Sequence, residues 1–84
     1  MFESLAEIEN LVKTDEFRFV KRKMLLFDAT LKMANSRNDL DKIKGDMDSF
    51  FGKLENDKKL YLVFAFNRYI LYKDIENRMS RYET

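Results

Sequence analysis

The chain has 84 residues and a formal net charge of +1, and it contains no cysteine, histidine or proline. This composition leaves room for one domain, excludes disulfides, thiolate nucleophiles and cysteine or histidine metal sites, and does not indicate general attraction to nucleic acid or acidic lipid. Only two glycines occur, so the frequent turns of β-sandwiches and barrels are missing and helices are favoured. Of the common aids to the stability of a small domain, oligomerisation remains open.

A first helix is predicted over residues 4–13. Ser4 and Glu7 have the spacing of a capping box, in which the serine side chain accepts a hydrogen bond from the Glu7 amide and the glutamate reaches back. Apolar residues follow at helical spacing, namely Leu5, Ile8, Leu11 and Val12. The N-terminal segment is acidic and has no cationic region before an apolar run. It therefore predicts no signal peptide, and a cytoplasmic location is expected.

A second helix is predicted over residues 15–35. Thr14 can cap it, and the carboxylates of Asp15 and Glu16 suit the positive end of the helix dipole. A coiled-coil-like apolar seam follows without a break, made of Phe17, Val20, Met24, Phe27, Leu31 and Ala34. A second row of residues seven apart, Phe19, Leu26 and Met33, makes the apolar face of this helix wide.

A third helix is predicted over residues 39–53, after a turn at residues 35–38 that offers several caps. Its apolar residues are Leu40, Ile43, Met47, Phe50, Phe51 and Leu54. Gly45 lies inside this helix and costs about 1 kcal/mol relative to alanine. Gly52 is expected to end the helix or to allow a bend near its end.

The segment from Leu60 to Tyr72 is the most apolar part of the chain. It is shorter than the ~20 residues of a membrane span and contains Arg68. A β-hairpin turning at residues 67–68 stays as the structural alternative, although arginine is poorly suited to the positive φ of the favoured two-residue turn. A helix over residues 57–82 is preferred because one stripe continues past the apolar run, through Tyr61, Ala65, Arg68, Tyr72, Ile75, Met79 and Tyr82. The fold class predicted is therefore all-α, a compact single-domain bundle of about four helices.

This last helix carries a second apolar arc. Leu62, Phe66 and Ile70 are spaced by four with Val63 beside them, roughly 100° to 200° around the helix from the Tyr61 stripe. A surface helix needs only one apolar face. Two interpretations stay open: the helix is central and enclosed by the other three, or the second arc binds another chain.

Charge alternates in sign along the chain. The net charges of residues 1–16, 17–37, 38–57 and 58–84 are −4, +5, −3 and +3. Antiparallel neighbours joined by short turns then meet opposite charge. Because exposed ion pairs contribute only about 0–1 kcal/mol each, this alternation is interpreted as favouring one topology more than supplying stability.

Catalytic and metal-binding patterns are absent. Calcium loops of the EF-hand type that begin at Asp39 or Asp46 have apolar or basic residues where an oxygen ligand and a glycine are needed. No glycine-rich phosphate loop and no cysteine or histidine nucleophile–base pair occurs. We therefore expect neither enzymatic activity nor a cofactor or metal ion.

Basic and aromatic residues suggest two contact surfaces. Arg18, Lys21, Arg22 and Lys23 form a basic cluster that is suited to phosphate contacts, which gives an alternative role in nucleic-acid binding. Arginine and tyrosine, which are enriched at interface hot spots, crowd the last helix. Arg68 lies on the apolar stripe, so its charge is expected to need a partner, either a second chain or one of Glu3, Glu7 and Asp39.

The sequence is typical of a small regulator that binds protein without catalysis. We expect it to self-associate through residues 57–82, residues 15–35 or both, as a homodimer in the first instance. The partner-binding residues predicted are Leu62, Val63, Phe66, Arg68, Tyr69 and Ile70. A short chain that starts at Met1 and lacks tails or linkers suits an accessory protein of the phage type, acting on a host or viral protein. A third interpretation is a cytoplasmic partner of a membrane lysis or transport protein.

Overall fold

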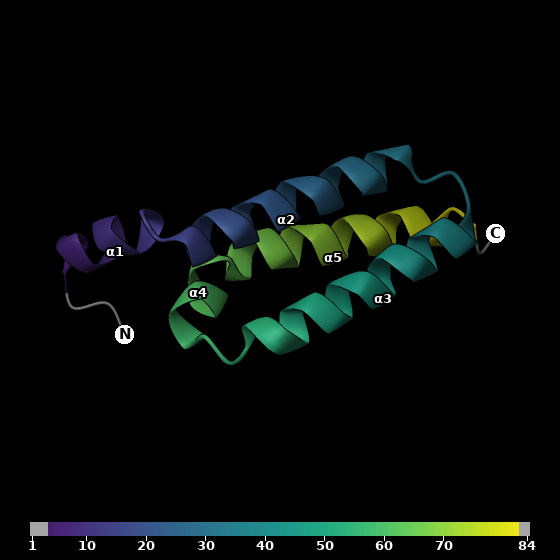
Figure 1. Ribbon diagram of the computed structural model, residues 1–84. Helices are drawn as coiled ribbons and strands as arrows, with labels where there is room; N and C mark the ends of the chain where they lie inside the picture. Colours follow the sequence, from purple (N-terminus) through teal and green to yellow (C-terminus); the bar gives the residue numbers. More distant parts are fainter. Residues whose placement is uncertain (1–3, 83–84) are drawn as a thin grey trace.

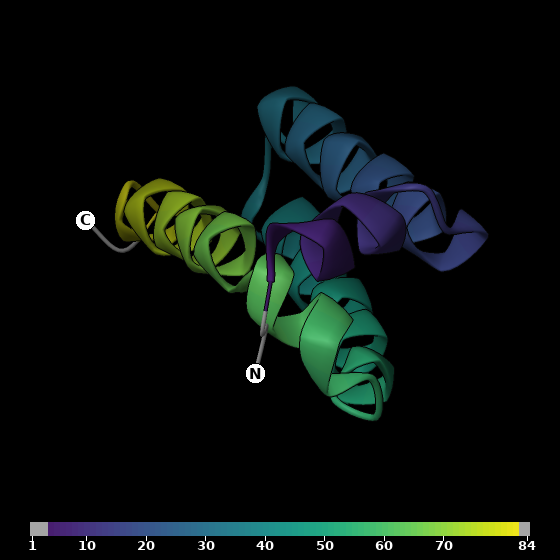
Figure 2. The same cartoon turned by 90° about the vertical axis from the view of Figure 1, so that its left-hand side faces the viewer.

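The computed structural model describes residues 4–82 and confirms an all-α bundle. Five helices occur in this part of the chain: α1 (Leu5–Val12), α2 (Asp15–Met33), α3 (Arg37–Leu54), α4 (Lys58–Val63) and α5 (Ala65–Ser80), drawn in Figure 1. The long helices α2, α3 and α5 each contact the other two, so they form a three-helix bundle. Seen nearly end-on, these helices occupy three corners, with α5 opposite the α2–α3 pair (Figure 2).

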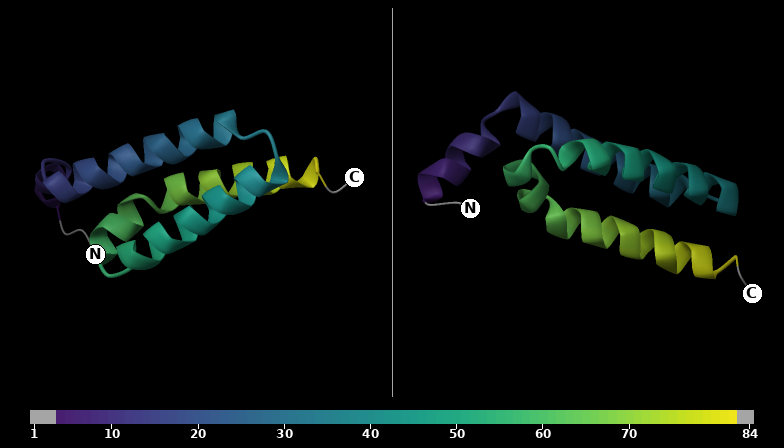
Figure 3. Two further views of the ribbon diagram at one scale, coloured as in Figure 1. Left: turned by 45° about the vertical axis from the view of Figure 1, so that its right-hand side comes forward. Right: turned by 90° about the horizontal axis from the view of Figure 1, so that it is seen from below.

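The molecule is elongated, with extents of 48 × 19 × 19 Å. Its length comes partly from α1, which extends from one end of the bundle beyond the long helices (Figures 1 and 3). Helix α4 is a short element at the same end and turns into α5. The bundle itself is therefore built by three helices, with α1 attached to it and α4 forming a corner.

Side-chain caps begin four of the helices. The Glu7 amide donates to Ser4 Oγ at 3.3 Å, and the Phe17 amide donates to Thr14 Oγ1 at 3.2 Å, as the sequence predicted. Ser36 Oγ and Asp57 Oδ1 cap α3 and α4 in the same way. Each cap satisfies an amide that the first helical turn leaves without a backbone partner. Because Ser36 is the cap, α3 begins at Arg37, two residues before the predicted start.

The core lies between the long helices. Its buried apolar residues are Val20, Met24, Phe27, Leu31, Leu40, Met47, Phe51, Leu54, Leu60, Phe64, Leu71 and Ile75. The predicted α2 seam supplies four of these, and its end members Phe17 and Ala34 pack against the core while half-exposed. The second α2 row points elsewhere, because Phe19, Leu26 and Met33 are all exposed.

The predicted helix over residues 57–82 is divided at Phe64. Its φ and ψ of −95° and 8° leave the α-helical region and change the helix direction between α4 and α5. The Phe64 ring is buried against Phe17 of α2, with ring centroids 5.1 Å apart. Packing of these two rings favours the bend. The hairpin alternative is wrong, because Asn67 and Arg68 lie inside α5.

The predicted buried stripe of the last segment is also displaced by about one residue. The fully buried positions are Leu60, Phe64, Leu71 and Ile75, whereas only Ile75 of the Tyr61 stripe is fully buried. The other stripe members described are half-buried, except Tyr82, which is exposed. Gly52 does not end α3, since the helix continues to Leu54 and no glycine there has a positive φ.

Charge alternation does not produce ion pairs between the long helices. Within residues 4–82, the ion pairs Arg18–Asp15, Lys32–Asp28, Lys73–Glu76 and Arg78–Asp74 each lie within one helix. Lys59 of α4 does pair with Glu7 of α1, which attaches α1 to the corner of the bundle. The opposite net charges of successive helices therefore attract each other only over distances longer than an ion pair, where salt partly screens exposed charges.

Candidate protein-interaction surfaces

Large apolar side chains remain exposed on three separate surfaces. The first, here called the outer patch, consists of Leu62, Phe66, Tyr69 and Ile70 on α4 and α5. The second is a groove between α2 and α3, here called the α2–α3 groove, which is lined by the exposed Phe19, Leu26 and Met33 and the half-exposed Ile43 and Phe50. The third is the face of α1 made by Leu5, Ile8 and Val12. Within residues 4–82, no further helix covers these three surfaces.

The outer patch contains most of the predicted second arc. Leu62, Phe66 and Ile70 are 41%, 70% and 48% exposed, and Tyr69 is 57% exposed. At 100° per residue, Phe66 and Ile70 lie on the side of α5 opposite the buried Phe64 and Ile75. The interpretation in which the last helix is enclosed by the other three is therefore wrong, because α2 and α3 cover only one side of α5. The second arc is available to another chain.

Two predicted binding residues do not belong to this patch. Val63 packs against the core, because it lies in the last turn of α4, where the chain bends toward α2. Arg68 is half-buried on the inner flank of α5, with its guanidinium 4.1 Å from the centre of the Tyr61 ring. The expected carboxylate partner is not found: within residues 4–82, Arg68 forms no ion pair. Glu3, one of the predicted partners, lies outside the described residues. The Tyr61 ring attracts the cation.

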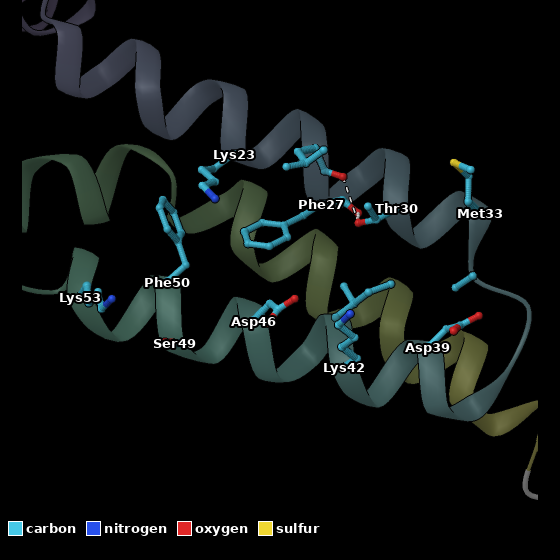
Figure 4. Close-up of a pocket in the computed structure, with 13 residues that line it drawn as sticks. Lys23, Phe27, Thr30, Met33, Asp39, Lys42, Asp46, Ser49, Phe50 and Lys53 are labelled. Atoms are coloured by element: carbon cyan, nitrogen blue, oxygen red, sulfur yellow. Dashed lines mark hydrogen bonds between the residues drawn. The ribbon is translucent and has the colours of Figure 1, made fainter.

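The α2–α3 groove is an open channel with an aromatic floor (Figure 4). Phe50 is central to it, with ring centroids 6.1 Å from Phe19 and 5.8 Å from Phe27. Lys23 lies above this floor, since its Nζ is 5.9 Å from the centres of both the Phe19 and Phe50 rings. Two adjoining cavities, of about 580 and 740 Å³, follow the groove and share Lys23, Phe50 and Lys53. The groove can therefore receive a rod-shaped apolar group such as a helix.

The predicted basic cluster is divided between two sides of α2. Arg18, Lys21 and Arg22 are exposed on the outer side, whereas Lys23 is half-buried in the groove. Arg18 also lies 3.7 Å from Asp15 in an exposed ion pair. Only three of the four cations therefore share a surface, and an acid borders it.

The α1 surface is attached to the bundle by few contacts. None of the residues in α1 is buried, and Leu11 alone packs against the core. The ion pair between Glu7 of α1 and Lys59 of α4 connects this helix to the corner of the bundle. This helix is therefore an amphipathic arm whose apolar face is open.

One titratable side chain has an environment that alters its chemistry. The Tyr72 hydroxyl of α5 donates to Asp48 Oδ1 of α3. Burial, this hydrogen bond and the negative charge of Asp48 raise the pKa of Tyr72, and Arg68 opposes them with a smaller effect. The phenol is held in its protonated form, so it ties two helices together and is a poor base. Residues 4–82 contain no cluster of acidic side chains that could hold a metal ion.

Neither family models, nor curated proteins, nor solved structures give a match to this chain. Of the helices described, none is long and apolar enough to cross a membrane. The three apolar surfaces and the charges beside them are the features of the described residues that suit binding to another molecule.

Proposed function

We propose that this chain is a small non-catalytic regulator or accessory protein that binds another protein through its outer patch. The observation that carries the proposal is the exposure of Phe66, Tyr69 and Ile70 on the side of α5 away from the core, with Leu62 of the neighbouring α4 exposed as well. Isolated exposed apolar residues are ordinary, whereas a contiguous group of aromatic and aliphatic residues marks an interaction surface.

The composition of the patch suits protein contact. Tyrosine is enriched at binding hot spots, and the patch contains Tyr69. A cation borders this tyrosine, because the Nζ of Lys73 is 5.8 Å from the centre of the Tyr69 ring. Removing one large apolar side chain from water gains about 1.5–3 kcal/mol when burial is complete. Burial of these four partly exposed side chains therefore offsets a part of the cost of association.

The test compares partner capture by two neighbouring variants. Tagged wild type, Phe66→Asp and Asn67→Asp proteins are incubated with lysate of the native host, and captured proteins are identified after nuclease treatment and washing at about 0.5 M salt, where charges are strongly screened. We expect one protein to be retained by wild type and Asn67→Asp and lost by Phe66→Asp. The control places the same charge on the next residue of α5, which is also exposed but lies 100° around the helix and outside the patch. Equal capture by all three proteins contradicts the proposal.

A role in nucleic-acid binding is the second candidate. It is supported by the shared exposure of Arg18, Lys21 and Arg22 on the outer side of α2. Phosphate contacts weaken steeply with ionic strength, whereas apolar contact through the outer patch does not. Capture that disappears on nuclease treatment or in salt favours this candidate. Cytoplasmic location, a phage-type setting and a membrane-protein partner stay predictions.

A further inference from the structure

We infer that a second copy of this chain occupies the α2–α3 groove, giving a two-fold symmetric dimer in which α2 of each copy lies over α3 of the other. This inference uses a surface on the opposite side of the bundle from the outer patch, and it does not depend on what binds there. Figure 3 shows that α5 lies to one side of the α2–α3 pair, so the other side of the pair is open. Three observations support a second copy as the occupant.

The first observation is a matched pair of heptad rows. Phe19, Leu26 and Met33 are seven residues apart on α2, and Ile43 and Phe50 are seven apart on α3. The Phe19–Phe50 ring contact shows the axial register of α2 relative to α3. In this register Leu26 and Ile43 line the same cavity. Residues repeated every seven positions form the seam of helices that pack side by side. Two α2–α3 pairs placed face to face make a core of four helices. Each layer of side chains in this core is repeated by the symmetry axis.

The second observation is that four of the charged side chains that line the groove have no ion-pair partner between α2 and α3. At one end of the groove, Glu16 of α2 lies near the level of Lys53 of α3. Further along, Lys23 of α2 and Asp46 of α3 line the same cavity. Within residues 4–82, none of these four side chains forms an ion pair. They are therefore free to meet charges brought by another molecule.

The third observation is that the charges are complementary to those of the same surface in a second copy. A two-fold axis parallel to the helices keeps the level of each residue and places α2 over α3 of the partner. Glu16 then faces Lys53 and Lys23 faces Asp46. An axis perpendicular to the helices instead lays α2 on α2, which brings together two helices that each carry a net charge of +2, from five basic and three acidic residues. Complementary charge sets register and orientation, and like charge opposes the alternative.

The dimensions indicate a moderate affinity. Helix α2 is about 28 Å long at 1.5 Å per residue, and the bundle is 19 Å wide. Each copy therefore contributes a footprint on the order of 500 Å², and the pair about 1,000 Å², near the lower limit for a specific interface. A dissociation constant in the micromolar range is expected.

Analytical ultracentrifugation over micromolar to millimolar protein tests the dimer. We expect a concentration-dependent monomer–dimer equilibrium for wild type and a shift to monomer for Leu26→Asp. Leu25→Asp is the matched control, because Leu25 is 62% exposed, more than Leu26 at 53%, and lines neither cavity. It should dimerise as wild type does. A wild-type protein that stays monomeric throughout, or equal effects of the two variants, overturns the inference.

A charge exchange tests the orientation with variants that leave the apolar groove intact. Lys23→Glu and Asp46→Lys should each raise the dissociation constant about tenfold, because each places like charges together at two symmetric positions. The double variant should return it to near the wild-type value. A double variant as weak as the single ones overturns the arrangement with α2 over α3. Phe66→Asp should leave the dimer unchanged, and Leu26→Asp should leave capture of a partner protein unchanged, so the two proposals fail separately.

Discussion

At the scale of single residues, Tyr72 joins α5 to α3. Its hydroxyl donates to Asp48 and its ring packs on Phe51 at a centroid distance of 5.9 Å. An exposed hydrogen bond of this kind contributes roughly 0.5–1.5 kcal/mol at neutral pH. The raised pKa of Tyr72 gives this contact a pH dependence as well.

Tyr72→Phe should flatten the alkaline loss of stability. In the unfolded chain a tyrosine loses its proton near pH 10, whereas the raised pKa keeps folded Tyr72 protonated at higher pH. Above pH ~10 the unfolded state therefore binds fewer protons, and the free energy of unfolding falls as pH rises, while the contribution is fully present below that pH. Urea unfolding followed by circular dichroism at several pH values measures the slope. We expect a shallower slope for Tyr72→Phe than for wild type.

Tyr69→Phe is the control for this measurement. Tyr69 is 57% exposed, and its hydroxyl forms no hydrogen bond with other residues of the described segment. The control should follow the wild-type slope. Identical slopes for wild type and Tyr72→Phe contradict the assignment of alkaline sensitivity to the Tyr72–Asp48 contact.

At the scale of elements, the corner between α4 and α5 depends on one buried ring. Phe64 is 6% exposed and its ring packs against the Phe17 ring at a tilt of 38°, whereas Phe66, two residues later, is 70% exposed. Phe64→Ala should lower the free energy of unfolding by about 3–5 kcal/mol, because it removes the ring and leaves a cavity. Phe66→Ala should change it by less than about 0.5 kcal/mol. Urea titration of both variants measures the difference.

Comparable losses for the two alanine variants would show that the outer side of α5 is covered by further protein in solution, or that the corner is not held by Phe64. Sedimentation at low protein concentration separates these causes, since a monomer leaves Phe66 uncovered. The same phenyl ring is removed in both variants, once from the buried corner at Phe64 and once from the exposed side of α5 two residues later.

The positions of α1 and α2 were predictable because their signals are local, whereas the division of the last helix at Phe64 was not predicted. The caps at Ser4 and Thr14 and the seam of α2 depend on spacing within a few turns, and the structure confirms them. The buried face of α5 was not predictable in the same way. Residues 60–72 are apolar on most sides of a helix, so the Tyr61 stripe and the Leu60–Phe64 row fit the pattern nearly equally. Contact with Phe17 of α2 decides between them.

Of the candidate surfaces, the one formed within a single segment was predictable from the sequence, and the one formed between two helices was not. The outer patch could be predicted, because Leu62, Phe66 and Ile70 lie on one side of a single helix. The α2–α3 groove could not, since its two heptad rows meet only when Phe19 stands beside Phe50. The repeated spacing of seven residues on α2 and α3 was a sequence signal for this groove. The register between these two helices, however, depends on the turn that joins them and on packing against α5.

At the scale of the whole molecule, the bundle has three long helices and therefore one core, with each helix covered on one side only. The α2–α3 pair is covered by α5, and its opposite side is open (Figures 2 and 3). A dimer through the α2–α3 groove covers that side and leaves the outer patch on α5 facing away from the symmetry axis. One small chain can then bind a copy of itself and present two partner-binding patches at once, so binding to a partner with two sites gains avidity.

The arm α1 is expected to be dispensable for folding of the bundle. In the described residues its contacts are with α2, the core contact of Leu11 and the Glu7–Lys59 ion pair. Deleting residues 1–13 keeps Thr14, whose side chain caps α2. We expect the free energy of unfolding to fall by about 1–2 kcal/mol, from the partial burial of Leu11 and one exposed ion pair.

Urea titration of the shortened chain measures this loss, and Leu11→Ala in the full chain is the control. If the arm acts only through its packing contact, the control should account for most of the loss. A shortened chain that is unfolded without urea contradicts the prediction. It would mean that α1 covers the bundle in solution through its exposed face, made by Leu5, Ile8 and Val12, which this structure leaves open.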